Sequence, residues 1–423
     1  MMNRYSQLAA CITFAIVVVG RTYGEDWPGF RGPTGNGISK ETSVPKSWNA
    51  NRNIKWKAPL PRPANGSPIV SNGRVFVTSA QDDAGRKRSL YCFNRKDGRQ
   101  LWVHTVDFGK EMPTHKTNPY CGSTPAANGD VVVAWHASAG LVCVDFGGNE
   151  VWSRDLGEFK HMWGYGTSPV IYKDRVILHS GPGVRNFVAA FDLQTGKTIW
   201  EVDELQKGKD GSSREDGKYK GSWCTPIVAN VDGIDQVICT MPTRVVAFDP
   251  RDGGIVWTCD GIRGPKGDLS YSSPLIGDGV LVAIGGYSGP GIGLRLGGKG
   301  NITDSSRLWR NEKNPQSIGS GVFINGYVYR PNAKPGTIEC LDPKTGEIIW
   351  TERSGTSWGS IVHVAGKCYL TNQEGETLVF EPNADKYEAV SSNPLGEPSN
   401  STPAVSDGQI FIRTFEHLYC IGE

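Results

Sequence analysis

Short runs in which apolar and polar residues alternate recur along this chain in a constant order. A hydroxyl residue, usually followed by proline, precedes an apolar run, a turn and a second apolar run, as in "SPIVSNGRVFV" at 67–77 and "SPVIYKDRVIL" at 168–178. Alternation of this kind predicts β-strands, and the pairs Asn-Gly, Lys-Asp and Asp-Gly between the runs predict tight hairpins. The pattern therefore predicts paired antiparallel strands.

A second phrase follows the first and ends in tryptophan. Copies stand at 91–102 ("YCFNRKDGRQLW"), 189–200 ("AAFDLQTGKTIW"), 246–257 ("VAFDPRDGGIVW") and 339–350 ("ECLDPKTGEIIW"). In each copy a strand with Ala or Cys in a cramped position leads to Asp or Asn, then to a turn containing Gly, then to a strand with Trp. The Gly is expected to supply a positive φ. Each repeat thus predicts four short strands and no helix.

The repeats are spaced for a propeller. Eight hydroxyl residues begin them, about every 48 residues: Ser67, Thr124, Ser168, Thr225, Ser273, Ser320, Ser360 and Thr402. Four-stranded antiparallel units without intervening helices are typical of propeller blades. We expect an all-β, eight-bladed β-propeller, with a seven-bladed ring as the alternative count.

The two ends of the chain predict how the ring closes. The last repeat stops at "LYCIGE", one strand short, and "NIKWKAPL" at 53–60 is a fourth strand without a repeat of its own. We expect the N-terminal strand to complete the last blade, since closure removes exposed strand edges. Tryptophans expected to dock each blade on its neighbour are Trp56, Trp102, Trp152, Trp200, Trp257, Trp309 and Trp350. In the seventh blade Tyr387 stands near the expected place.

The spacing Ala-x-Asp-x-x-x-Gly-x-x-x-Trp, met from Ala190 to Trp200 and from Ala247 to Trp257, resembles the tryptophan-docking motif of pyrroloquinoline quinone (PQQ)-type propeller repeats. "DWPGFRGPTGNGIS" at 26–39 also resembles the start of exported bacterial proteins of this class, most of unassigned activity. The resemblance covers nearly the whole mature chain. It implies the fold, and it is weak evidence for the cofactor.

The N-terminus predicts export. The apolar run from Leu8 to Gly20, after Arg4, has the length of a signal-peptide core and is too short to span a bilayer. Thr22 and Gly24 precede the expected cut. The domains are then a signal peptide (1–24), an N-terminal extension (25–52) and the propeller (53–423). We expect a periplasmic or extracellular protein with no integral membrane segment in the mature chain.

Charge and cysteine content narrow the partners. The net charge is +2 over 423 residues, which offers no electrostatic basis for binding nucleic acid. Nine cysteines follow the signal; Cys92, Cys143, Cys340 and Cys420 share the repeat's small core position. The others are left open to a disulfide: Cys121, Cys224, Cys239, Cys259 and Cys368.

Catalytic signals are weak. The seven histidines are scattered without metal-ligand spacing, and no Gly-x-Ser-x-Gly joins a strand to a helix. The family resemblance implies a test: PQQ enzymes hold the quinone with a calcium ion bound by Glu, Asn and Asp beside a catalytic Asp. No such constellation can be matched residue by residue, and adjacent cysteines are absent. Catalytic residues, a metal site and a cofactor are therefore not predicted, and PQQ with calcium is kept as an alternative.

A site is expected where the repeat is broken. Links between blades cross one face of a propeller and surround its central channel, where ligands bind. Aromatic side chains on these links are our candidate ligand-binding residues: His115, Tyr120, His161, Trp163, Tyr165, Trp223, Tyr271 and Trp358. The opposing interpretation is that they plug the channel.

The sequence favours an exported, non-catalytic binding or scaffold protein with a protein or carbohydrate at the channel mouth. One alternative is a PQQ- and calcium-dependent dehydrogenase. The other is a role like that of the propeller factor in outer-membrane protein assembly.

Overall fold

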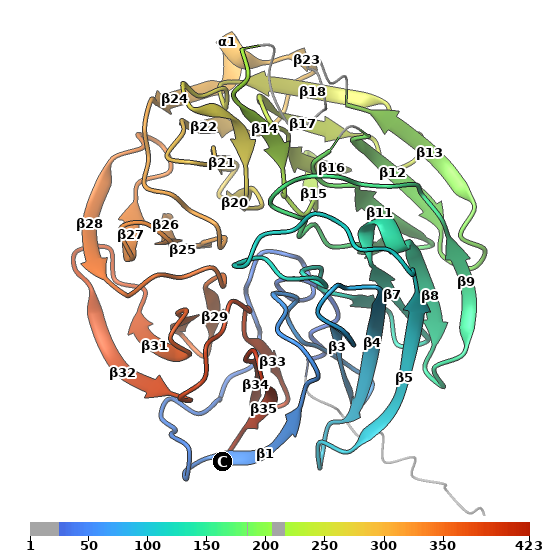
Figure 1. Cartoon of the computed structure of the whole chain (residues 1–423). Coiled ribbons are helices and arrows are strands. Elements are labelled where there is room, and N and C mark those ends of the chain that lie inside the picture. The colour runs from blue at the N-terminus through green and yellow to red at the C-terminus, as the bar shows by residue number, and fades with distance from the viewer. Residues whose placement is uncertain (1–24, 184, 205–215) are drawn as a thin grey trace, which may run out of the picture.

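The computed structural model describes residues 25–183, 185–204 and 216–423. The predicted signal peptide lies outside the described residues. Eight sheets stand around one axis like the blades of a propeller (Figure 1). The predicted all-β, eight-bladed architecture is confirmed.

The first four blades follow one another along the chain. Blade 1 contains β2 (Ile69–Ser71), β3 (Arg74–Ala80), β4 (Lys87–Asn94) and β5 (Gln100–Asp107). Blade 2 contains β6 (Ala126–Ala127), β7 (Val131–Trp135), β8 (Leu141–Asp145) and β9 (Glu150–Arg154), with the 3-10 turn η1 (Ala137–Ala139). Blade 3 contains β10 (Val170–Tyr172), β11 (Arg175–His179), β12 (Phe187–Asp192) and β13 (Thr198–Asp203). Blade 4 contains β15 (Ile227–Val231), β16 (Ile234–Thr240), β17 (Arg244–Phe248) and β18 (Ile255–Asp260).

The other four blades complete the ring. Blade 5 contains β20 (Leu275–Gly277), β21 (Val280–Ile284), β22 (Gly291–Arg295) and β24 (Arg307–Asn311). Blade 6 contains β25 (Val322–Ile324), β26 (Tyr327–Asn332), β27 (Thr337–Leu341) and β28 (Ile348–Arg353). Blade 7 contains β29 (Val362–Val364), β30 (Lys367–Thr371), β31 (Glu376–Glu381) and β32 (Glu388–Pro394). Blade 8 contains β33 (Ala404–Ser406), β34 (Gln409–Arg413), β35 (His417–Ile421) and the N-terminal β1 (Ile54–Pro59).

Blade 8 closes the ring in the predicted way. β1 pairs antiparallel with β35, and Trp56 lies opposite Cys420 (Figure 1). The ends of the chain thus share one sheet, and the contacts continue on either side of it. Arg95 of blade 1 forms an ion pair with Asp407 of blade 8 at 2.9 Å and donates to the Ser406 carbonyl. With β1 in place, each of the eight described blades has its fourth, outer strand, so the third strand of blade 8 is not left as an open edge.

The eight hydroxyl residues that begin the repeats form a belt of hydrogen bonds around the channel. At seven of the eight junctions a backbone N–H donates to the next side-chain oxygen at 2.9–3.0 Å. The last of these bonds runs from Thr402 to Ser67, which joins the final repeat to the first. At the remaining junction the Ser273 hydroxyl donates to the Thr225 carbonyl at 2.8 Å. The hydroxyl at this position therefore satisfies buried backbone groups that the short inner strands leave unpaired.

The repeat tryptophans cover the turn of the following blade. The Trp200 indole N–H donates to the Pro250 carbonyl at 3.0 Å, and Trp152 donates to Leu193 at 2.9 Å. A Cβ on Gly196 would lie 2.6 Å from the Trp152 ring, and one on Gly253 would lie 2.7 Å from the Trp200 ring. The turn needs glycine for two reasons, because these residues also have φ of +67° and +76°.

Two blades depart from the docking pattern. Blade 5 has an extended connection with β23 (Gly300–Asn301) and α1 (Thr303–Ser306) in place of the repeat turn, and β23 pairs with β18. Trp257 is therefore fully buried and donates to Gln236 of its own blade. In blade 7, Ser391 occupies the register position of the tryptophan, opposite Val379.

The residue near the expected place in blade 7, Tyr387, packs instead on Trp350 of blade 6, with ring centroids 5.8 Å apart. The N-terminal extension supplies the missing aromatic side chain. Trp48 is buried in the core shared by blades 7, 8 and 1, and its backbone N–H donates to Asn393 Oδ1 at 2.9 Å. A tryptophan from outside the repeats thus packs at this junction.

The extension crosses the face that carries the first turn of each blade. Trp27 pairs with Val70 of blade 1, and Ile38 bridges to His363 of blade 7. Farther on, Glu41 accepts from the backbone N–H groups of Asp407 and Gly408 in blade 8. The links between blades lie on the opposite face because the strands of a blade alternate in direction. The extension therefore covers the far end of the channel.

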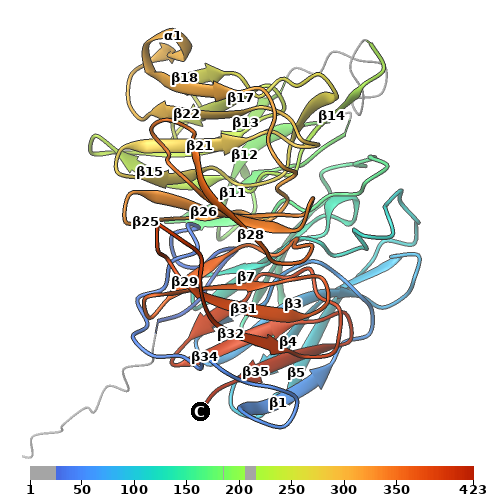
Figure 2. The ribbon, with the colours of Figure 1, turned by 90° about the vertical axis from the view of Figure 1, so that its left-hand side faces the viewer.

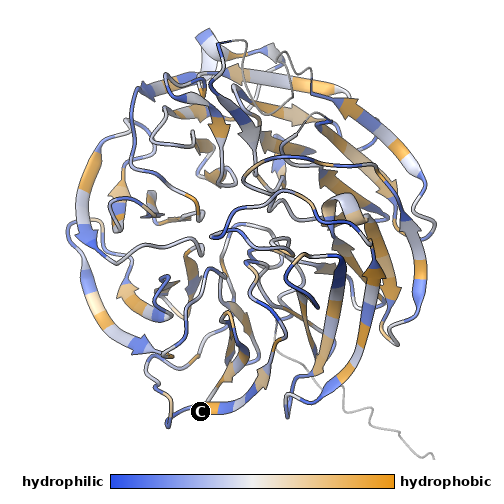
Figure 3. Cartoon of the chain, in the orientation of Figure 1, coloured by the Kyte–Doolittle hydropathy of each residue, from blue (hydrophilic) through white to orange (hydrophobic). Residues whose placement is uncertain are grey.

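Hydropathy separates the inner from the outer strands. Inner and middle strands are largely apolar and buried, while outer strands such as β5 and β28 mix polar and apolar residues and are mostly exposed (Figure 3). All nine described cysteines are buried and unbridged. Cys224 and Cys239 are neighbours without a disulfide between them, with their Sγ atoms 3.8 Å apart. Among the described residues, no helix has the length and apolarity that crossing a bilayer requires.

Candidate functional site

A cavity of about 470 Å³ opens on the face that carries the links between blades. Its volume lies in the range of about 300–1,000 Å³ that small-molecule sites occupy. The floor includes seven of the eight belt residues, all except Ser168, together with Phe30 of the N-terminal extension. Phe30 also lines a second hollow that the extension forms with blades 2–4. The cavity is thus open at the mouth and closed below by the extension.

One wall of the cavity is built on an addition to the repeats. The link before blade 4 contains β14 (Tyr219–Ser222), and the link before blade 5 contains β19 (Gly267–Ser270). The two strands pair in parallel. β14 stands off one face of the disc (Figure 2). Tyr219 begins β14, whereas Trp223 and Tyr271 directly follow the two strands. This ladder fixes three aromatic side chains beside the channel.

The aromatic side chains of this wall contact one another at an angle. Trp163 lies 4.5 Å from Tyr219, 5.9 Å from Trp223 and 6.1 Å from Tyr287, measured between ring centroids. The corresponding interplanar angles are 42°, 35° and 34°. Tyr271 meets Trp223 edge-on at 5.4 Å. We call Trp163, Tyr219, Trp223, Tyr271 and Tyr287 the aromatic wall; it forms a cup of tilted rings.

The buried charges under the wall belong to its scaffold. Lys220 and Asp268 occupy the same register in the parallel ladder, and both are buried. Burial lowers the pKa of the Lys220 ammonium, and the nearby carboxylates of Glu204 and Asp268 oppose that shift. Arg263 pairs with Asp268 at 3.2 Å. These groups hold the ladder in place and do not line the cavity.

The opposite wall carries amide side chains that are bonded in series. Gln373 donates to Asn400, Asn400 to Asn65, and Asn65 to Asn118, at 2.7, 3.0 and 3.0 Å. Asn118 in turn donates to the Trp163 carbonyl at 2.7 Å. The series runs from blade 7 across the junction of the chain ends to blade 3. It ties the links together and gives the mouth a polar side.

Hydrogen-bond donors dominate the unpaired polar groups of the cavity. The indole N–H groups of Trp163 and Trp358 and the Lys334 ammonium have no hydrogen-bond partner among the described residues. Burial raises the pKa of the Tyr271 phenol, so this hydroxyl stays protonated at neutral pH. Lys266 lies over the Tyr287 ring, 5.5 Å from its centroid. No aspartate or glutamate is among the described lining residues.

The structure brings five of the eight predicted aromatic residues to this cavity: His115, Trp163, Trp223, Tyr271 and Trp358. The other three are buried behind it. Tyr120 donates to the Met112 carbonyl, Tyr165 donates to the His136 carbonyl at 2.9 Å, and His161 packs edge-on against Trp223 at 4.8 Å. These three therefore support the links rather than face the mouth.

Sequence reasoning missed Tyr219, Tyr287 and Lys334. Tyr287 and Lys334 lie on hairpins between the second and third strands of blades 5 and 6, which end on the same face as the links. Tyr219 lies on the same link as Trp223, and nothing in the sequence distinguishes it from the polar residues around it. The alternating direction of strands within a blade was the available signal, because it places these hairpins beside the links.

The cavity does not fit PQQ held by a calcium ion. Calcium takes about 6–8 oxygen ligands, and carboxylates are commonly among them. The described lining contains no carboxylate side chain. The oxygens of Asn65, Asn118 and Asn400 each accept a hydrogen bond from the neighbouring amide. The donor set is therefore wrong for this ion.

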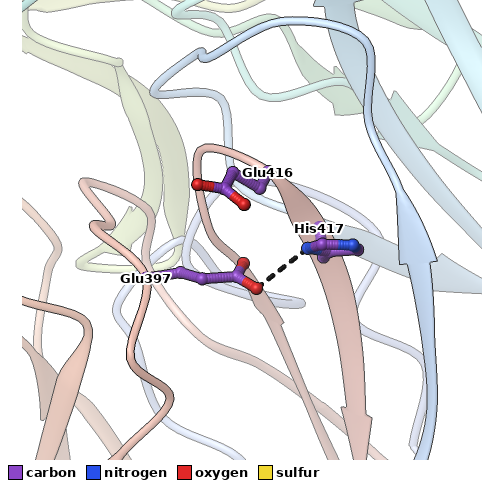
Figure 4. Close-up of side chains that lie close together, drawn as sticks. All are labelled: Glu397, Glu416 and His417. Atoms are coloured by element: carbon purple, nitrogen blue, oxygen red, sulfur yellow. Dashed lines mark hydrogen bonds and ion pairs between the residues drawn. The ribbon is translucent and has the colours of Figure 1, made fainter.

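Among the described residues, one group of acidic and histidine side chains has metal-ligand spacing: Glu397, Glu416 and His417 (Figure 4). It lies between the link before blade 8 and the β34–β35 hairpin. Burial raises the pKa of Glu397, but hydrogen bonds from Thr414, Tyr419 and His417 outweigh that effect and leave it below its usual value. Since both Glu397 oxygens already accept bonds, we interpret the group as a hydrogen-bonded cluster.

Comparison with known proteins places the chain in a family. A family model described as outer membrane protein assembly factor BamB matches residues 47–118, 86–352 and 334–420, nearly the whole propeller. The chain belongs to this family of PQQ-like β-propellers. The resemblance seen in the repeat motif is thereby confirmed.

Curated relatives of this propeller are distant. Quinohemoprotein alcohol dehydrogenase ADH IIB of Pseudomonas putida is 22% identical over 358 residues, which are 79% of this chain and 49% of the relative. The chain thus spans about half the length of that dehydrogenase. Outer membrane protein assembly factor BamB of Yersinia pestis is 24% identical over 287 residues, 56% of this chain and 68% of the relative.

Solved structures of both kinds share the fold. The quinohemoprotein alcohol dehydrogenase of Comamonas testosteroni superposes with a TM-score of 0.68 and 14% identity, over 96% of this chain and 82% of that chain. BamB from Moraxella catarrhalis gives 0.60 and 15%, over 88% and 97%. At these identities the likeness establishes the propeller and not the activity.

Proposed function

We propose that this protein is an exported, non-catalytic binding protein whose channel mouth holds a carbohydrate. The observation that carries the proposal is the aromatic wall, which repeat packing does not require. Tyr219, Trp223 and Tyr271 sit on or directly after strands that lie outside the blades. A scaffold alone would need neither this ladder nor a cavity beside it.

The shape of the wall favours a sugar over a flat aromatic ligand. The rings around Trp163 are inclined by 34–42° to it, so they form a cup and not a parallel slot. A puckered pyranose carries C–H groups that can pack against aromatic rings set at different angles, and aromatic side chains with a few polar groups commonly line concave ligand sites. Belt residues with hydroxyl side chains line the floor below, and a hydroxyl that accepts a backbone N–H keeps its own O–H donor.

The test is binding of a panel of neutral and acidic oligosaccharides by isothermal titration. W163A is expected to weaken binding by tenfold or more, on the order of 1.4 kcal/mol or above, with a small change in melting temperature. The matched control is I199A, which removes an exposed apolar side chain from the outer strand β13. Binding equal to wild type in W163A would contradict a site at the mouth, and so would the absence of binding by any sugar.

A second candidate is a role in outer-membrane protein assembly. It is favoured by the family model and by the agreement with nearly the full length of the Moraxella BamB structure. The mouth would then hold a protein partner. Cross-linking from a photoreactive residue at position 287, followed by identification of captured proteins in the native host, distinguishes it. Capture of outer-membrane assembly components favours this candidate over sugar binding.

A PQQ- and calcium-dependent dehydrogenase is the remaining alternative. The fold is compatible with it, but the donor set of the cavity is not. Reconstitution with PQQ and calcium, followed by gel filtration and absorbance of the retained quinone, tests it directly. Stoichiometric retention of the quinone would favour the dehydrogenase.

A further inference from the structure

We propose that the carbohydrate bound at the channel mouth is acidic, a chain of uronic acid units, and that Lys334 selects it by pairing with a carboxylate. This inference rests on the proposed function and adds to it the chemical class of the ligand and a specificity-determining residue. It comes from the distribution of charge and of unpaired donors around the aromatic wall.

The formal charge in the described lining of the cavity is positive. Lys334 is the formally charged residue of the described lining, and its side chain is exposed at the mouth. It has no carboxylate partner within the described chain, unlike Arg330, which pairs with Glu339 at 2.8 Å in the adjoining strands of the same blade. A lysine left unpaired beside a concave aromatic site is suited to a ligand anion.

A second cation flanks the wall. The Lys266 ammonium lies 5.5 Å from the centroid of Tyr287, a ring that itself contacts Trp163 and Tyr219. Contact with the aromatic face holds this charge at the rim. Lys334 and Lys266 come from blade 6 and from the link before blade 5, so the cations rise from neighbouring elements. A chain with an acid group on every unit could meet both.

The neutral groups of the mouth also act as donors. The indole N–H groups of Trp163 and Trp358 donate only, and the Tyr271 phenol remains protonated because burial raises its pKa. The amide oxygens of Asn65, Asn118 and Asn400 are engaged in the series from Gln373 to Asn118, and the Gln316 side chain offers one further amide oxygen in the lining. Carboxylates are the strongest acceptors that a sugar carries, so an acidic sugar complements these donors.

The experiment compares a charged ligand with its neutral form. Tri-galacturonate, tri-mannuronate and tri-glucuronate are titrated into the wild-type protein together with their fully methyl-esterified counterparts. Esterification keeps the ring and removes the charge. We expect at least one uronate to bind at least tenfold more tightly than its ester at low ionic strength, and the difference to shrink as salt rises.

The variants assign the effect to a residue. K334Q is expected to weaken uronate binding about tenfold and to leave ester binding unchanged. K266Q should give a smaller loss of the same kind. The control is K344Q, which removes an exposed lysine on the opposite face, in the β27–β28 turn, and should match wild type. K334R keeps the charge and should retain the preference.

The outcomes separate the two proposals. If esters bind as tightly as uronates, or K334Q keeps the preference, the acidic ligand is wrong and sugar binding at the mouth stands. If neutral oligosaccharides bind and all uronates fail, the acidic ligand is again overturned. If no oligosaccharide binds to wild type, both proposals fail together.

Discussion

Two sets of tryptophans in this propeller illustrate how one residue type serves two purposes. Trp200, at the end of a repeat phrase, is 7% exposed, and its indole N–H donates to a carbonyl of the next blade. Trp163, on a link, is half-buried, and its indole has no acceptor among the described residues. Most of the tryptophans that end repeat phrases pack on a turn of the next blade, with a glycine beneath the ring. The tryptophans on the links lie beside other aromatic rings and line the cavity. Packing partners, not residue type, distinguish scaffold from site.

The largest effect is expected from breaking the closed ring. Removing residues 25–60 deletes β1, leaves β35 with a free edge and takes Trp27, Trp48 and Trp56 out of one core. We expect loss of cooperative melting or aggregation, measured by calorimetry and light scattering. The control is a chain that begins at Glu25. A truncated monomer with the control's melting temperature would contradict ring closure as the source of stability.

The next effect separates the two sets of tryptophans directly. W200A removes a large buried side chain and should cost about 3–5 kcal/mol in the free energy of unfolding. W163A removes a half-buried ring and should cost about 1 kcal/mol or less while it weakens ligand binding by tenfold or more. Denaturant melts of both variants measure the difference. Equal losses of stability would mean that the mouth tryptophans are channel plugs, and the proposed site would be wrong.

A smaller effect tests why the docking turn contains glycine. G196A meets two costs, the left-handed φ of +67° and a Cβ 2.6 Å from the Trp152 ring. The matched control is G73A, with φ of +73° and no heavy atom within 4 Å of the added Cβ. We expect about 1 kcal/mol of destabilisation for G73A and about 2–3 kcal/mol for G196A. Similar losses of stability in the two variants would show that the Trp152 side chain moves away from the added Cβ without cost.

The smallest effect is a pH dependence that belongs to the scaffold. Burial lowers the pKa of His136 to about 3, and the charge of Arg88 adds to the shift. Because the folded pKa lies below the unfolded value, the stabilisation is complete above about pH 6.5 and decreases as pH falls, by up to about 1.4 kcal/mol per pH unit. The melting temperature should therefore fall from pH 7 to pH 5, and less so in H136F. H115Q, at the mouth, should follow wild type; identical pH profiles for wild type and H136F would contradict the assignment.

Much of the fold was predictable because the strands and turns of each blade are specified by short segments of sequence. The hydroxyl residue, the hairpin pairs and the Asp-to-Gly turn act over a few residues, so their period alone indicates eight blades. The strand deficit at "LYCIGE" and the surplus at 53–60 likewise predict closure. The docking partner of Trp257 and the position of Tyr387 were not predictable, since both depend on a neighbouring blade that departs from the repeat.

The candidate site was predictable only in part. The break in the repeat predicted a site on the links, and five of the eight named residues line the cavity. Tyr120, His161 and Tyr165 are on the same links, but their side chains are buried in the protein and do not line the cavity. Whether a link residue faces the channel depends on how its loop packs over the blades beneath, and a single chain has no periodicity there to indicate orientation.

The sequence by itself determined the blade, the number of blades and the family, because strand alternation, turn residues and the spacing of tryptophans are properties of short segments repeated in register. Only the tertiary structure decided which side chains meet. The parallel pairing of β14 with β19 joins two links about 50 residues apart, and the cavity gathers residues from Phe30 to Thr402. The physical reason is that closure brings every link to one axis, so the site is formed by positions that no local pattern relates to one another.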